Sequence, residues 1–119
     1  MSGELEQPDR GDLDLPTVLA ALADPSRLAC VRALARHGET SCSDLIDRTG
    51  IECSKSTGSH HLRVLREAGV ISMRVSGVHR YSTVRRADLD AAFPGLLDAV
   101  LAPPWDERSG GQARSAASG

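Results

Sequence analysis

The stretch that decides the fold is CSKSTGSHHLRVLREAGVI, residues 53–71. It reads as a helix ending at Gly69, yet Gly58 lies inside it. A glycine in the middle of a helix costs roughly 1 kcal/mol relative to alanine. At about 100° per residue, Gly58 falls on the same side of the helix as Leu62 and Leu65. We therefore expect Gly58 to face the interior, where the missing side chain lets two backbones approach closely.

The opposite side of this helix is small, polar and rich in hydrogen-bond donors. Ser56, His60 and Arg63 fall within about 60° of one another, and within this helix no acidic residue precedes Glu67. Such a surface fits the major groove of DNA, where hydroxyl groups reach bases or phosphates and arginine bonds to guanine. The alternative is an ordinary solvent-exposed face. The candidate DNA-binding residues of the helix are Lys55, Ser56, Thr57, Ser59, His60 and Arg63.

The net charge of −2 conceals an uneven distribution along the 119 residues. Residues 51–86 hold seven Lys/Arg and two acids, whereas the rest of the chain holds seven basic and fourteen acidic residues. Three of the four histidines also lie in the basic segment. A basic segment in an acidic chain is typical of a surface that binds a polyanion.

Composition at both ends predicts a single small domain. Residues 1–14 and 103–119 are polar and lack periodicity, so we expect flexible tails around a domain over residues 15–102. With one Trp, one Tyr and one Phe, the core must be aliphatic, and a domain this small gains from dimerising. No apolar run approaches the roughly 18 residues that span a membrane, and there is no signal peptide, so we expect a cytoplasmic protein.

Helix start and stop residues place further elements on both sides of the decisive stretch. Asp24 before Pro25 predicts a helix start, Gly38 its end, and Ser54 the start of the decisive helix. The expected helices cover LPTVLAAL (15–22), a segment starting at residue 25, SCSDLIDRTG (41–50), residues 55–68 and ADLDAAFPGLLDAVL (87–101), with a kink or restart at Pro94.

Alternating residues after the decisive helix predict a β-hairpin over about residues 70–83. Ile71, Met73 and Val75 share one face, with a turn at Ser76–Gly77. The order is therefore α-α-α-α-β-β-α, mostly α with a β-hairpin, which is a winged helix-turn-helix. Basic residues on the hairpin, the wing, are candidates to reach phosphates or the minor groove: Arg74, His79 and Arg80. The alternative is a hairpin with exposed cations and no partner.

Several of these motifs resemble the ArsR–SmtB family of bacterial winged-helix repressors. The likeness covers roughly Leu19 to Thr83 and rests on LADPSRL, SDLIDRTG and KSTGSHHLRVLREAGVI, with SHHLRVLREAG its most specific part. The resemblance implies a homodimer joined through its first and last helices. It also implies a repressor that occupies a palindromic double-stranded DNA operator until an inducer releases it. The expected dimer-interface residues are Leu19, Leu22, Leu89, Phe93, Leu97 and Val100.

Both familiar metal sites of that family are missing from the sequence. Many arsenic, cadmium and lead sensors carry two cysteines separated by one residue at the start of the third helix, where this chain has Ser41 and Ser43 around Cys42. Zinc sensors use histidine on the last helix, which has none here. We expect no metal ligands of these kinds, no cofactor and no catalytic residues.

The three cysteines leave the inducer open. Cys30 lies beside an apolar stripe and is expected in the core. Cys53, just before the decisive helix and near Lys55, is favourably placed for a thiolate, and Cys42 is a second candidate. Oxidation at either would displace the helix, so a redox or electrophile sensor is one hypothesis. A metal or small-molecule site at the dimer interface is equally plausible.

Two other classes of protein fit the sequence less well. An enzyme would pair a cysteine with a histidine and an acid, but Cys53 with His60 or His61 implies no cleft, and we do not expect an enzyme. His61, at the boundary of the apolar face, is expected to be a half-buried structural residue rather than a DNA contact. A winged helix used only to bind another protein is the main alternative, and salt-dependent binding to DNA distinguishes the two.

Overall fold

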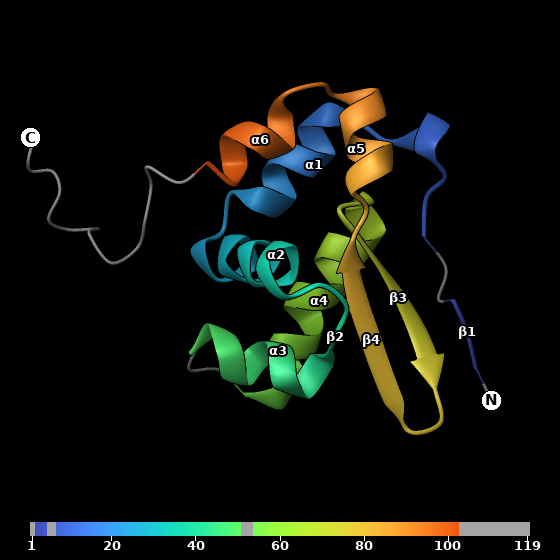
Figure 1. Ribbon diagram of the computed structural model, residues 1–119, viewed down its shortest axis with the longest axis vertical. Coiled ribbons are helices and arrows are strands. Elements are labelled where there is room, and N and C mark those ends of the chain that lie inside the picture. The colour runs from blue at the N-terminus through green and yellow to red at the C-terminus, as the bar shows by residue number, and fades with distance from the viewer. Residues whose placement is uncertain (1, 5–6, 51–53, 103–119) are drawn as a thin grey trace, which may run out of the picture.

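The computed structural model of this chain describes residues 2–4, 7–50 and 54–102 (Figure 1). In chain order the elements are β1 (Ser2–Glu4), the 3-10 turn η1 (Arg10–Asp12), α1 (Leu15–Leu22), α2 (Pro25–His37), β2 (Thr40–Ser41), α3 (Cys42–Thr49), α4 (Lys55–Ala68), β3 (Ile71–Ser76), β4 (His79–Val84), α5 (Arg86–Ala92) and α6 (Leu96–Val100). The predicted winged helix-turn-helix, mostly α with a β-hairpin, is confirmed. The predicted C-terminal tail, residues 103–119, lies outside the described residues.

Helix boundaries agree with the prediction because nearby side chains cap the helices. The carboxylate of Asp24 accepts hydrogen bonds from the backbone N–H groups of Ser26 (2.8 Å) and Arg27 (3.1 Å) at the start of α2. The hydroxyl of Ser54 accepts one from the backbone N–H of Thr57 (3.1 Å) at the start of α4. These bonds satisfy N–H groups that have no partner within the helix.

The hairpin is confirmed, but its turn lies one residue later than predicted. Ser76 pairs with His79, so the connecting residues are Gly77 and Val78, whereas the sequence predicts a turn at Ser76–Gly77. Gly77 has φ +62°, a conformation that glycine adopts without steric cost and that two-residue hairpin turns require. The alternation of the strands is unchanged by this shift.

Two further strands extend the hairpin into an antiparallel sheet of order β1-β3-β4-β2. The N-terminal strand corrects the expectation of a flexible tail over residues 1–14, because Ser2–Glu4 pair with β3. The side chain of Arg85 also donates a 2.6 Å hydrogen bond to the carbonyl of Pro8. Pairing through backbone groups at the edge of a sheet needs no apolar pattern, so the composition of this segment did not reveal it.

The last predicted helix is two helices. α5 ends at Ala92, and α6 begins at Leu96 after Pro94 and Gly95. Proline lacks the N–H that a continuing helix needs, and Gly95 has φ +88°, which turns the chain before α6. The kink-or-restart expected at Pro94 is therefore a restart.

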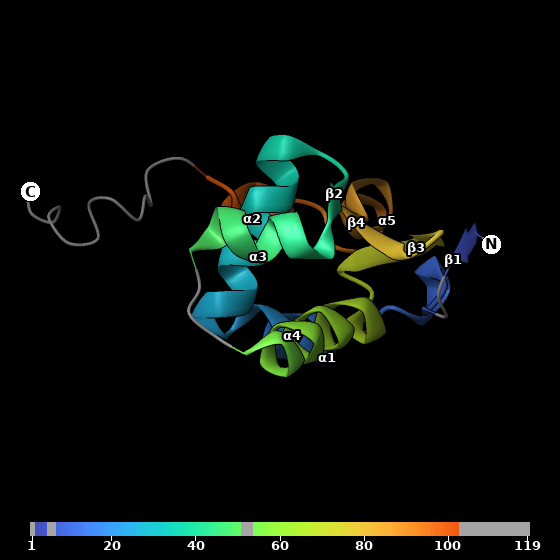
Figure 2. The same cartoon turned by 90° about the horizontal axis from the view of Figure 1, so that it is seen from below.

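The core is aliphatic, as predicted, and lies between the helices and the sheet. Its fully buried members are mainly leucine, valine, isoleucine and alanine, with Cys30 among them. Figure 2 shows α4 beside α1, with α2 and α3 on the other side of the body. Among the helices in the described ranges, none is long and apolar enough to cross a membrane.

Candidate nucleic-acid interface

The helix α4 presents the polar face that the sequence predicted. Ser56, Ser59, His60 and Arg63 are exposed, and we call these four residues the recognition face. On the opposite side, Gly58 and the leucines at positions 62 and 65 are buried, with 2% and 0% of the two leucines exposed. The spacing of apolar residues therefore predicted correctly which side of α4 meets solvent.

The remaining two candidates on α4 lie at its first turn. Thr57 is exposed, but its hydroxyl accepts a 2.9 Å hydrogen bond from the hydroxyl of Ser54, so it also belongs to the N-terminal cap. Lys55 is the first residue of the helix. Within the recognition face, Arg63 Nη2 lies 3.4 Å from His60 Nδ1, which orients the two side chains together.

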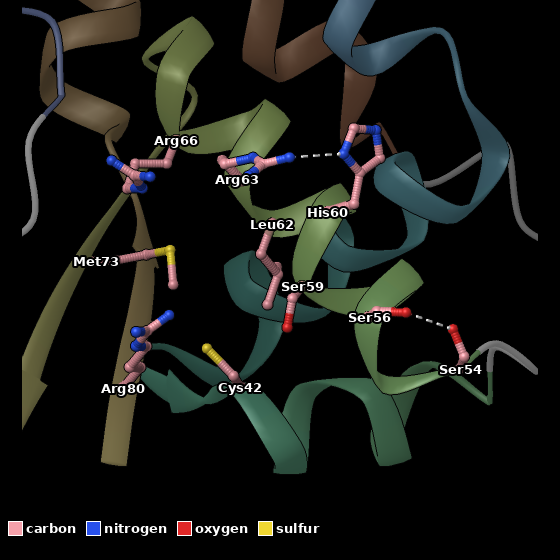
Figure 3. A pocket seen from close by; sticks show the side chains of 10 residues that line it. All are labelled: Cys42, Ser54, Ser56, Ser59, His60, Leu62, Arg63, Arg66, Met73 and Arg80. Atoms are coloured by element: carbon pink, nitrogen blue, oxygen red, sulfur yellow. Dashed lines mark hydrogen bonds between the residues drawn. The ribbon is translucent and has the colours of Figure 1, made fainter. Parts of the chain in front are cut away.

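The recognition face forms one wall of an open groove of about 870 Å³ (Figure 3). α3 and the wing supply the other walls. The residues that line the groove are Cys42, Ser54, Ser56, Ser59, His60, Leu62, Arg63, Arg66, Met73 and Arg80. Among these described lining residues there is no aspartate or glutamate. Guanidinium groups, an imidazole and hydroxyls around an open groove can bind phosphates and the edges of bases.

The candidate wing residues point to two different sides of the hairpin. Arg80 pairs with Val75, and Met73 pairs with Ser82, so these four side chains share the face that turns toward α4. Arg74 pairs with Tyr81 on the other face. The structure therefore brings Arg80 together with the recognition face and places Arg74 away from it.

Arg74 already has partners on that outer face. Its Nε and Nη2 donate hydrogen bonds of 2.7 and 2.8 Å to the two carboxylate oxygens of Glu39. The guanidinium carbon lies 4.8 Å from the centre of the Tyr81 ring. The hydrogen bond from Arg74 lowers the pKa of Glu39 below its ordinary value, so the carboxylate stays charged at neutral pH. His79, exposed beside the turn, has its ring 6.1 Å from that of Tyr81.

Arg66, which lines the groove, and Glu39, which binds Arg74, were not among the predicted site residues. Arg66 lies on α4 three positions after Arg63, a spacing that places both on one side of a helix, and this signal was present in the sequence. Glu39 carried no such signal, because it lies 35 residues from Arg74 in the chain.

The cysteines differ in surroundings. Cys30 is fully buried, as predicted. Cys42 is half-buried at the wall of the groove, with its Sγ 4.0 Å from the hydroxyl of Ser82. Burial raises the pKa of the Cys42 thiol above its ordinary value, and the hydrogen bond with Ser82 and the charge of Arg80 oppose that rise only in part. Cys53 lies outside the described residues.

The sequence predicts neither of the familiar metal sites of the ArsR–SmtB family. Across residues 2–4, 7–50 and 54–102, no group of three or more His, Cys, Asp or Glu side chains is placed to hold a metal ion.

His61 is half-buried, with Nδ1 3.4 Å from Nη1 of Arg27. That guanidinium also donates to the carbonyl of Ala21 (2.7 Å) near the end of α1. The structure thus places His61 beside the start of α2, at the edge of the recognition face.

The predicted interface residues divide between surface and core. Leu19 is 47% exposed, while Phe93 and Val100 are partly buried. Leu22, Leu89 and Leu97 are already buried within the single chain, at 7%, 1% and 1% exposure, and belong to its core. The pattern of apolar residues marks which face of a helix is buried, but does not say whether the same chain or a partner covers it.

Known proteins are similar to this chain in sequence and in fold. Residues 22–74 match a helix-turn-helix domain family. The chain is 34% identical over 84 residues to YceK, an uncharacterized HTH-type transcriptional regulator of Bacillus subtilis (strain 168), covering 70% of this chain and 82% of YceK.

Two solved structures extend the comparison to the fold. One is the crystal structure of an ArsR family transcriptional regulator, 25% identical with a TM-score of 0.61, covering 71% of this chain and 90% of that one. The other is the solution structure of a homodimeric winged helix-turn-helix DNA-binding domain from Mycobacterium bovis, a possible ArsR-family regulator. It is 28% identical with a TM-score of 0.59, covering 72% of this chain and 76% of that one. The chain therefore belongs to the ArsR family of winged helix-turn-helix transcriptional regulators.

Proposed function

We propose that this protein is a homodimeric repressor that occupies a palindromic operator through α4 and the wing, and leaves it when an inducer is sensed. The observation that carries the proposal is the groove in which the recognition face, Arg66 and Arg80 meet, with no carboxylate among its described lining residues. A face with this chemistry attracts the phosphate backbone and offers donors to the major groove.

The residues of the groove divide into two roles. Ser56, Ser59 and Arg63 lie on the exposed side of α4, where short hydroxyls and one guanidinium reach base edges. Arg80, on the wing, and Arg66, farther along α4, flank that face and are assigned to phosphates. His60 stands beside Arg63 and is assigned to orient its guanidinium.

Dimerisation is assigned to the apolar surface that the single chain leaves open. Leu15 and Leu19 on α1 are 41% and 47% exposed. Phe93 and Val100 are only partly buried. A homodimeric relative of similar fold supports the assignment. A two-fold dimer places its two recognition helices about 34 Å apart, one turn of DNA, which is why the operator is proposed to be palindromic.

The proposed inducer acts through a thiol. Cys42 lines the groove itself, so a group added to its sulfur would occupy space that DNA needs. Its raised pKa opposes this route by keeping the thiol protonated. Cys53 remains the second candidate thiol. A metal ion or small molecule bound at the dimer interface is the alternative inducer.

Binding to the DNA that flanks its own gene tests the proposal. Fluorescence anisotropy with the reduced protein would be measured at several salt concentrations, with Arg63→Gln, Arg80→Gln and, as control, Arg86→Gln. Arg86 is an exposed arginine just after β4, at the end of the hairpin away from its turn, and it is paired with Asp90 and Asp98. Its replacement by glutamine removes one positive charge, as the other two substitutions do.

Each variant has a distinct expected result. Arg63→Gln weakens specific binding by about 1–3 kcal/mol, because arginine pairs with a base. Affinity falls as salt rises, and Arg80→Gln makes the slope of log affinity against log salt shallower by about 0.9, the value for one phosphate. Arg86→Gln changes neither. Absence of DNA binding at every salt concentration would refute the repressor and leave the protein-interaction module.

Titration of the bound complex identifies the inducer. Peroxide, a thiol-reactive electrophile, Zn(II) and As(III) would be added in turn. Release by oxidant that dithiothreitol reverses, and that Cys42→Ser or Cys53→Ser abolishes, supports the thiol route. Release by metal in the variant lacking both thiols supports the interface alternative.

A further inference from the structure

Three side chains cross the outer face of the sheet, on the side of the hairpin away from α4. Glu39 immediately precedes β2, Tyr81 lies in β4, and Arg74 lies in β3. The strands are adjacent in the order β3-β4-β2. The side chain of Arg74 therefore passes over the ring of Tyr81, at 4.8 Å, to reach Glu39 on the far side. We call Glu39, Tyr81 and Arg74 the strap.

The strap adds a side-chain link between the wing and the helical body, beside the backbone pairing of β2 with β4. Glu39 follows α2 and precedes α3, so its backbone belongs to the body (Figure 1). β2 is only two residues long and pairs with β4 at Ser82 and Tyr81. The bidentate pair adds a bridge from the residue before β2 to β3, the hairpin strand with which β2 does not pair. Two charge-assisted hydrogen bonds of 2.7 and 2.8 Å hold one geometry better than a single contact would.

The same contacts remove Arg74 from DNA recognition. Its pairing with Tyr81 places it on the face opposite Arg80, which lines the groove. Its guanidinium already shares both oxygens of a carboxylate, and Glu39 would repel any phosphate brought near it.

We propose that the strap sets the position of the wing, and so the width of the groove between Arg80 and α4, with Glu39 and Arg74 as positioning residues for DNA binding. The inference rests on the proposed function, because it takes the groove as the DNA site. It also reassigns Arg74, one of the wing residues that the sequence offered as a DNA contact.

The test compares Glu39→Gln, Arg74→Gln and the exchange Glu39→Arg with Arg74→Glu in the full-length protein. If Arg74 held a phosphate, Glu39→Gln would tighten DNA binding by removing a negative charge beside it. If the strap positions the wing, Glu39→Gln instead weakens DNA binding by about two- to five-fold, the scale of one well-formed exposed ion pair. Arg74→Gln weakens binding by a similar factor and leaves the salt slope unchanged. The exchanged pair restores affinity to within about two-fold.

Amide hydrogen exchange of β3 and β4 without DNA provides an independent readout. Each single variant is expected to speed exchange across the hairpin, and the exchanged pair to slow it again. Arg86→Gln, the loss of another exposed paired arginine, is the matched control and leaves hairpin exchange unchanged. Thermal melts followed by circular dichroism confirm that each variant is folded.

The possible outcomes separate the two proposals. Two results would overturn the proposed role of the strap and make Arg74 a phosphate contact. One is tighter DNA binding by Glu39→Gln, and the other is a slope of log affinity against log salt that becomes shallower by about 0.9 in Arg74→Gln. An exchanged pair as weak as Arg74→Gln would overturn it as well. Failure of the wild-type protein to bind DNA refutes the proposed function, while hydrogen exchange still decides whether the strap holds the wing.

Discussion

At the scale of single residues, the arginines of this chain differ in role because each meets a different partner. The side chain of Arg85 is 8% exposed, bonded to Asp88 and to the carbonyl of Pro8, and fastens the N-terminal segment. Arg74 is bound to Glu39. Arg63 remains on the exposed side of α4, facing the groove. A count of basic residues in the sequence predicted a polyanion-binding surface, but it could not tell which arginine faces the groove and which is bound to a carboxylate.

The thiol of Cys42 gives a prediction at the same scale. Burial raises its pKa above the ordinary value, so less of it is thiolate at neutral pH than in an unfolded chain. Alkylation of Cys42 by iodoacetamide is therefore expected to be several-fold slower in the folded protein than in urea. Because the thiolate is the reacting form, the rate should level off at a higher pH in the folded protein than in urea. Peptide-level mass spectrometry measures it for each cysteine separately.

The other cysteines supply the controls for this experiment. Cys30 is fully buried and should react only after unfolding. Equal rates for Cys42 in folded and unfolded protein would show that its thiol is accessible and ordinary, and would strengthen its candidacy as the sensor.

At the scale of elements, α4 is held at its C-terminus by a close packing contact. Gly69 ends the helix with φ +88°, and a Cβ built there would lie 2.1 Å from Cδ2 of Leu13 and 3.2 Å from Cγ of Pro8. Gly69 thus has two reasons to be glycine, its left-handed backbone and the approach of the segment before α1. The segment expected to be a tail therefore packs against the end of the recognition helix.

Substituting the two helix-ending glycines separates these reasons. Gly50 ends α3 with φ +68°, and no atom lies within 4 Å of a Cβ built there. Gly50→Ala is expected to lower the free energy of unfolding by about 1–2 kcal/mol through backbone strain alone. Gly69→Ala should cost that amount plus about 1–3 kcal/mol for overpacking. Urea denaturation measures both, and equal losses would mean that Leu13 swings aside without cost.

At the scale of the whole molecule, the exposed leucines of α1 predict how two copies associate. Leu19→Glu would place a charge in the proposed interface and is expected to weaken dimerisation roughly 30-fold or more, about 2 kcal/mol. Analytical ultracentrifugation measures the dimer directly. Because Leu19 is 47% exposed in the single chain, the variant should keep its fold.

A second exposed apolar residue is the control for that variant. Val78, 93% exposed in the turn of the wing, lies far from α1, so Val78→Glu should leave the dimer intact. Sedimentation of Leu19→Glu like the wild type would move the interface away from α1.

The sequence by itself determined the features that depend on neighbours in the chain. The limits of α2 and α4 follow from caps within three residues, such as Asp24 with Ser26 and Arg27. The recognition face follows from the period of α4, which separates Ser56 from buried Leu65. Hydrogen bonds and periodicity of this kind act over a few residues, so they can be predicted from the sequence alone.

Only the tertiary structure decided which distant groups meet. It paired Glu39 with Arg74 across 35 residues, brought Cys42 and Arg80 to the groove beside α4, placed Leu97 in the core, and added Ser2–Glu4 to the edge of β3. Each outcome depends on the packing of whole elements. Local preference leaves such choices open, because a charge or an apolar face is compatible with any partner that packing brings near it.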